Sequence, residues 1–65
     1  MENYATAIED FNKSIELNPN YGLAYSRRGS AKFNLNNKTG ACADWNKAVE
    51  FGYDKAQSLI DENCQ

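Results

Sequence analysis

The apolar residues of this chain recur with the spacing of α-helices. In the first segment they stand three or four positions apart, which places their side chains on one face of a helix. This face carries Tyr4, Ala7, Ile8, Phe11 and Ile15. The same spacing of apolar residues recurs around Trp45 in a later segment. The pattern predicts three long helices and one short helix, at about 2–17, 21–35, 38–51 and 55–63.

The predicted helices are separated by residues that disfavour a continuing helix. Pro19 ends the first helix, because the residue before a proline avoids the helical region. Gly52 is expected to end the third helix in a left-handed conformation. Asp54, followed three residues later by Gln57, predicts a capping box for the last helix. Short connections make successive helices antiparallel neighbours, so we expect an all-α fold of antiparallel helix-turn-helix repeats.

The sequence contains an internal repeat, in which residues 37–51 copy the pattern of residues 3–17. When the two segments are aligned, most matched positions are identical or keep their apolar character. The identical pairs are Asn3 and Asn37, Ala7 and Ala41, Asp10 and Asp44, Asn12 and Asn46, Lys13 and Lys47, and Glu16 and Glu50. The period of this repeat is typical of units built from a pair of helices, which bury their core by stacking on their neighbours.

The period and the repeated residues resemble the tetratricopeptide repeat family. The first helix of that repeat carries a large aromatic residue and, four positions later, a glycine, which are Tyr25 and Gly29 here. The second helix carries an alanine, an aromatic residue and another alanine, and Pro19 matches the closing proline. The alanine–aromatic–alanine positions are Ala41, Trp45 and Ala48, with Ala7, Phe11 and Ser14 in the first copy.

The resemblance implies how the chain divides into repeats. Residues 1–19 would be the second helix of a first repeat, residues 20–53 one complete repeat, and residues 54–65 a terminal capping helix. The tail at 44–64 also resembles a Sel1-type repeat, so the last helix is either a cap or the start of another repeat. Polar residues favour a cap, because solenoids end with a polar outer face. These residues are Asp61, Glu62, Asn63 and Gln65.

Three positions depart from the family pattern, and one of them is Tyr53, which replaces a second closing proline. Arg28 and Lys32 stand where the family often has leucine and tyrosine. Long basic side chains can lie along apolar surface and keep their charge in water. We therefore expect the helix to accommodate both residues.

Charge and composition argue against several classes of function. The net charge is −2, and basic residues are scattered between acidic ones, which is not the basic face of a nucleic-acid-binding protein. No apolar stretch approaches the ~20 residues of a membrane span. The chain has no histidine and no catalytic motif, and two cysteines alone cannot make a structural zinc site. We expect no enzyme activity, no cofactor and no metal, and the sequence leaves the cellular compartment open.

The family resemblance implies a protein–protein interaction module that binds a peptide segment of a partner on its concave face. The implied groove residues are Leu23, Ser26, Arg27, Ser30, Phe33 and Asn34. Arg27 would pair with a ligand carboxylate. In the alternative interpretation, Phe33 packs against another repeat and Arg27 is solvated. The chain would then be a structural or self-assembling piece of a solenoid without a peptide ligand.

The first predicted helix has no partner helix from its own repeat. Isolated helices are marginally stable in water, so its apolar face is expected to meet a second copy of the chain. The resulting homodimer would use Tyr4, Phe11 and Ile15, with Ala7 and Ile8 beside them. The alternative is a monomer whose first helix folds back over the second.

The two cysteines are placed symmetrically about the last predicted turn. Cys42 stands eleven residues before Tyr53 and Cys64 eleven residues after it. In an antiparallel pair such residues come level, and packed helix axes ~8–10 Å apart allow the Cα separation of ~4.4–6.8 Å that a disulfide needs. A disulfide would fix the last helix. Two reduced cysteines in a reducing compartment are the alternative.

Overall fold

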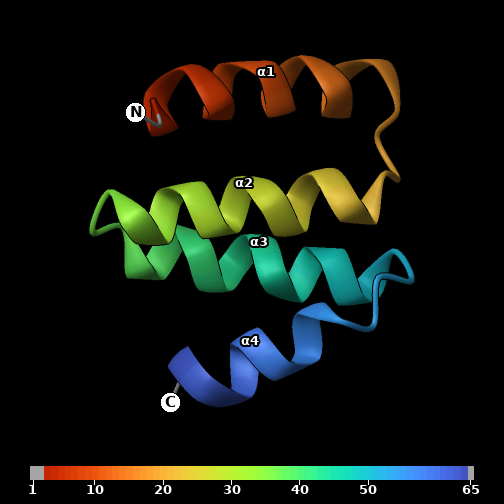
Figure 1. Cartoon of the computed structure of the whole chain (residues 1–65). Helices are drawn as coiled ribbons and strands as arrows, with labels where there is room; N and C mark the ends of the chain where they lie inside the picture. The colour runs from red at the N-terminus through yellow and green to blue at the C-terminus, as the bar shows by residue number, and fades with distance from the viewer. Residues whose placement is uncertain (1–2, 65) are drawn as a thin grey trace.

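The computed structural model describes residues 3–64 and shows four α-helices stacked in chain order (Figure 1). The helices are α1 at Tyr4–Leu17, α2 at Gly22–Asn34, α3 at Lys38–Glu50 and α4 at Ala56–Asn63. Each helix runs antiparallel to the one before it, and the described residues include no strand. The predicted all-α fold with three long helices and one short helix is confirmed. The proposed repeat boundaries fall in the connections between helices, and the division itself stays a prediction.

The starts of α1 and α3 use the same cap, at matching positions of the two repeat copies. The side-chain oxygen of Asn3 accepts a hydrogen bond from the Thr6 backbone N–H at 3.1 Å. Asn37 accepts one from the Gly40 backbone N–H at 3.0 Å. Each bond satisfies a backbone donor that the first turn of a helix leaves without a partner. The identity of Asn3 and Asn37 in the repeat therefore has a direct structural reason.

The other helix ends agree with the sequence in one case and correct it in another. Gly52 has a φ of 93°, the left-handed conformation expected after α3. The capping box predicted for α4 is wrong. The helix begins one residue later than such a box requires, with Lys55 as its N-cap and no side-chain bond to the cap. The Gln57 side chain donates instead to Asp61 Oδ1 at 3.0 Å.

The most deeply buried side chains lie at the contacts of α3 with its neighbours. The central cluster consists of Ala41, Trp45, Ala48 and Ala56. Trp45 is only 2% exposed, and its indole N–H donates to the Ser26 carbonyl oxygen of α2 at 3.1 Å. Alanine at the flanking positions lets the helix axes come close around this one large ring. The alanine–aromatic–alanine pattern of the second repeat copy is thus the core of the molecule.

Gly29 lies where α2 approaches the indole of α3 most closely. A Cβ at this position would lie 2.8 Å from two atoms of the Trp45 ring and 3.0 Å from the Ala41 carbonyl oxygen. Trp45 is enclosed and the carbonyl belongs to the backbone, so neither can move aside cheaply. The small residue is therefore required by packing.

The Gly29→Ala substitution is expected to destabilise the fold. In a solvent-exposed helix, glycine to alanine stabilises by about 1 kcal/mol. Here the overpacking should outweigh that gain and cost roughly 1–3 kcal/mol. Urea denaturation of the variant and the parent measures the difference. An increase in stability would show that the two helices can separate without loss.

Candidate functional site

A hollow surface follows the seam between α1 and α2. It consists of two adjoining cavities of about 380 and 310 Å³. The larger cavity is lined by Tyr4, Ala7, Phe11, Arg27, Ser30, Ala31 and Asn34. The smaller cavity is lined by Phe11, Ser14, Tyr21, Leu23, Ala24 and Arg27. Phe11 and Arg27 line both cavities, so the two form one continuous depression, which we call the α1–α2 groove.

The α1–α2 groove combines apolar and hydrogen-bonding side chains. Ala24 and Ala31 of α2 are buried, and Phe11 of α1 is half-buried between them and solvent. Arg27 is exposed beside this apolar part, and Asn34 lies at one end of the groove. A surface of this kind can take an apolar side chain and hydrogen-bond a polar group next to it.

Four of the six predicted groove residues line the α1–α2 groove, and two do not. Ser26 is only 5% exposed and lies against α3, where its carbonyl oxygen accepts the indole N–H of Trp45. Phe33 is 38% exposed, with its ring centroid 5.7 Å from that of Trp45. Each residue of an α-helix is turned ~100° from the last, so the Ser26 side chain lies about a quarter turn around the helix from that of Arg27. Contrary to the prediction, Ser26 and Phe33 therefore lie outside this groove.

Some of the residues predicted to mediate self-association also line the α1–α2 groove. Tyr4, Ala7 and Phe11 line its larger cavity. Ile8 and Ile15 are half-buried and line neither cavity. The structure thus brings much of the predicted groove set and part of the predicted self-association set together on one surface.

An ionic cluster around the buried carboxylate of Asp44 joins the first three helices, and sequence reasoning missed it. The Arg28 guanidinium binds both carboxylate oxygens of Asp44 at 2.8 and 2.7 Å, and donates to Asn12 Oδ1 at 2.8 Å. Lys32 Nζ lies 3.2 Å from Asp44 Oδ2. Because Asn12 belongs to α1 and Asp44 to α3, the Arg28 side chain of α2 connects all three helices.

The ionic cluster explains why Arg28 and Lys32 depart from the family pattern. Arg28 and Lys32 are one helical turn apart and converge on Asp44 of the neighbouring helix. The hydrogen bonds that Arg28 donates to the Asp44 carboxylate raise the pKa of Arg28 above its ordinary value, while partial burial opposes the rise. Arginine stays charged at any relevant pH, so the guanidinium keeps its positive charge beside Asp44. The signal in the sequence was Asp44, a carboxylate close to the buried face of a helix.

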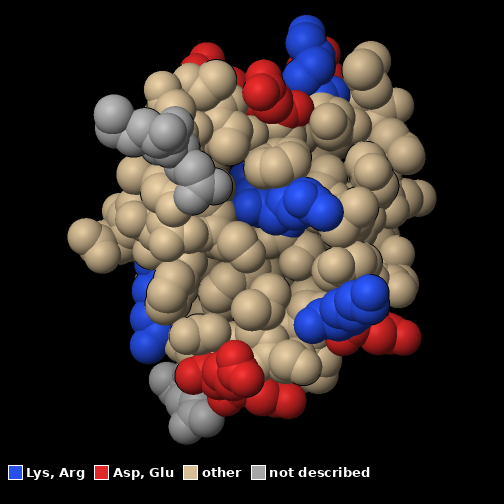
Figure 2. Space-filling view, in the orientation of Figure 1, with Lys and Arg blue, Asp and Glu red and all other residues tan. Residues whose placement is uncertain are grey.

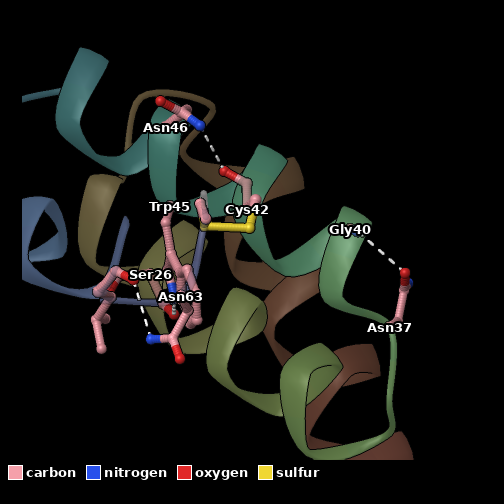
Figure 3. The surroundings of a disulfide bond; sticks show 9 residues. Ser26, Asn37, Gly40, Cys42, Trp45, Asn46 and Asn63 are labelled. Carbon is pink, nitrogen blue, oxygen red and sulfur yellow. Dashed lines mark hydrogen bonds between the residues drawn. A yellow bond between two sulfur atoms is a disulfide. The ribbon is translucent and has the colours of Figure 1, made fainter. Parts of the chain in front are cut away.

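Cys42 and Cys64 are joined by a disulfide in the structure (Figure 3), with their Cα atoms 5.8 Å apart. The bond connects the second turn of α3 to the C-cap of α4. Both cysteines are half-buried, and together with Lys38 and Thr39 they line a surface hollow of about 420 Å³. The disulfide thus lies close to solvent, away from the α1–α2 groove.

Other kinds of site are not evident in the part of the chain that the structure describes. Residues 3–64 hold no group of three or more histidine, cysteine or acidic residues that could bind a metal ion. No helix among them has the length and apolar character to cross a membrane. Basic and acidic side chains are interspersed on the face shown in Figure 2. The absence of nucleic-acid binding stays a prediction.

The stacked antiparallel helices and the internal period define a helical-repeat protein. The tetratricopeptide repeat family model matches residues 1–21. That match covers α1 and its cap, and α3 repeats the same pattern in the second copy. Together these findings support the tetratricopeptide repeat family for this chain. The Sel1-type resemblance of the tail stays a prediction.

The chain is also similar to short regions of longer proteins. It is 44% identical over 50 residues to RNA polymerase II-associated protein 3 of Xenopus tropicalis, covering 77% of this chain and 8% of that protein. It is 38% identical over 50 residues to the human protein of the same name, with the same coverage. The DnaJ homolog subfamily C member 7 homolog of Dictyostelium discoideum is 39% identical over 57 residues, covering 88% of this chain and 9% of that protein.

The chain therefore spans less than a tenth of the length of these curated relatives. No solved structure matches the chain significantly. The family match and these relatives support a protein–protein interaction module as the general role of the chain.

Proposed function

We propose that this chain holds an extended peptide segment of a partner protein in the α1–α2 groove. The observation that carries the proposal is the continuity of the groove, which runs from Tyr4 past Phe11 and Arg27 to Tyr21. α2 has 13 residues and is therefore ~20 Å long. An extended peptide of about six residues has the same length.

The side chains of the groove suggest the chemistry of the peptide. An apolar side chain of the ligand would lie on Phe11 and the buried alanines of α2. Arg27 is exposed and would donate to a ligand carboxylate beside it. The peptide would thus carry an apolar residue followed or preceded by an acidic one. The name of RNA polymerase II-associated protein 3 says that these relatives associate with another protein, which fits an adaptor role.

The Arg27→Ala substitution is expected to weaken peptide binding about tenfold or more, because a hydrogen bond to a charged group contributes ~1.5–3 kcal/mol. The probes are peptides selected from a random display library for binding to the parent chain. Their dissociation constants are measured on both proteins by fluorescence anisotropy.

Lys55→Ala is the matched control, because it removes the same charge from an exposed position outside the groove. It should leave the dissociation constants within about twofold of the parent. Peptides that bind Arg27→Ala as tightly as the parent would reject the role of the groove. A selection without peptides above background would favour a purely structural role.

We propose self-association through α1 as a second candidate function. α1 has no fully buried residue, whereas α3 buries Ala41, Trp45 and Ala48 at the corresponding positions. The matching positions of α1 are less buried than those of α3, so α1 keeps an apolar face that a further helix would cover. A second copy of the chain would supply such a helix, with Tyr4, Phe11 and Ile15 at the interface.

The Phe11→Asp substitution is expected to convert the dimer into a monomer, since it puts a charge at the centre of the apolar face. Light scattering at high protein concentration measures the mass of both proteins. Lys13→Asp, on the exposed side of the same helix, is the control and should stay dimeric. A parent chain of monomer mass would refute self-association without affecting the proposal of peptide binding.

A further inference from the structure

α4 is attached to the rest of the molecule differently at its two ends. It has eight residues, and only Ala56 at its start is fully buried. Leu59 and Ile60 are partly buried against the central cluster. Its end is fixed by the disulfide between Cys64 and Cys42 of α3. An eight-residue helix is too short to be stable alone, so its position depends on these few attachments.

The polar contacts that hold the other helices together do not involve α4. The indole N–H of Trp45 binds the Ser26 carbonyl, and Asp44 binds Arg28, both between α3 and α2. Arg28 also binds Asn12 of α1. Loss of α4 would therefore leave the polar connections among α1, α2 and α3 in place.

We propose that the Cys42–Cys64 disulfide is a redox latch, whose reduction releases α4 from α3 while α1, α2 and α3 remain folded. The reductant is a dithiol. One thiolate attacks a sulfur of the disulfide, forms a mixed disulfide and frees the other cysteine. The second thiol of the reductant then displaces the remaining cysteine. Two electrons and two protons pass to the cysteines, which become thiols, and the dithiol becomes a disulfide.

The location of the disulfide suits this exchange. Both cysteines are half-buried, and they line the open hollow with Lys38 and Thr39. Figure 3 shows the two sulfurs at the side of α3, with Trp45 further along the helix. A small dithiol can approach this hollow, and the positive charge of Lys38 favours an incoming thiolate.

The expected size of the effect follows from loop closure. The disulfide closes a loop between residues separated by 22 positions. Cutting a loop of this length releases chain entropy that changes the equilibrium on the order of a hundredfold. Undocked α4, which is rare in the oxidised chain, should become common in the reduced chain.

Hydrogen–deuterium exchange of the whole chain tests the redox latch, with and without dithiothreitol, and mass spectrometry verifies the state of the cysteines. We expect the α4 amides to exchange on the order of a hundredfold faster after reduction. The amides of α2 and of the α2-facing side of α3 should change much less. A Cys42→Ser/Cys64→Ser variant should exchange like the reduced parent, and the dithiol should not change its exchange rates.

Three results would overturn the proposal. The first is unchanged protection of α4 in fully reduced protein. The second is equal acceleration of α2 and α4, which would make the disulfide a support of the whole fold and not a latch on one helix. The third is the presence of two free thiols in protein kept under air, because the latch would then not form.

Discussion

Replacement of Trp45 by alanine is expected to remove most of the cooperative fold. The indole is 2% exposed, contacts the ring of Phe33 and donates its N–H to α2. Loss of a buried tryptophan costs roughly 3–5 kcal/mol. A chain of this length has a total stability of only about 3–10 kcal/mol. Circular dichroism on heating should show reduced helicity and a broad transition or none.

Phe11→Ala is the matched comparison, because Phe11 holds the position of Trp45 in the first copy of the repeat. Phe11 is half-buried beneath the open groove, so its loss should cost about half as much. The variant should still melt cooperatively. If Trp45→Ala melted within a few degrees of the parent, or if both substitutions had equal effects, the core would not be centred on Trp45.

The comparison of Phe11 with Trp45 also shows what the sequence could predict. The helical spacing, the proline and the period specified four helices and their order, because these features depend on local geometry. They did not specify burial, since both aromatic residues occupy the same place in the pattern. Burial depends on the helices that flank each copy. Within residues 3–64, α1 packs against α2, whereas α3 lies between α2 and α4.

The predicted groove residues that line the α1–α2 groove are those on the side of α2 that faces α1, and their role in binding stays a prediction. Residues were assigned to the groove from the family pattern, which cannot resolve a small rotation of the helix. In the structure the indole N–H of Trp45 needs an acceptor and finds the Ser26 carbonyl, which lies on the α3 side. The position of the two cysteines was easier to predict, because it needs only their equal distance from the turn.

The ionic cluster could not be predicted from local pattern, because Arg28 and Asp44 are 16 residues apart. Their pairing requires the register between α2 and α3. The internal repeat gave no indication of this pairing, since Asp10 has the same place in α1 and is exposed. The same residue type is thus a buried ion-pair partner in one copy and a solvated surface residue in the other.

Asp44→Ala is expected to destabilise the chain by about 3 kcal/mol, because it leaves two cations without their partner. The value lies at the low end for a buried pair, since Arg28 and Lys32 keep 18% and 24% of their side-chain surface exposed and can turn toward water. Urea denaturation monitored by circular dichroism measures the difference. Urea carries no charge and does not screen the ion pairs.

Asp10→Ala is the control, because it removes the same side chain from the matching position of the first repeat copy, where it is exposed. It should change the free energy of unfolding by no more than about 0.5 kcal/mol. Arg28→Met in the Asp44→Ala background should recover part of the loss, because it removes one of the two unpaired cations and keeps the apolar stem. Equal effects of Asp44→Ala and Asp10→Ala would mean that packing alone sets the register of α2 and α3. Recovery by Arg28→Met would instead assign the loss to the uncompensated charge.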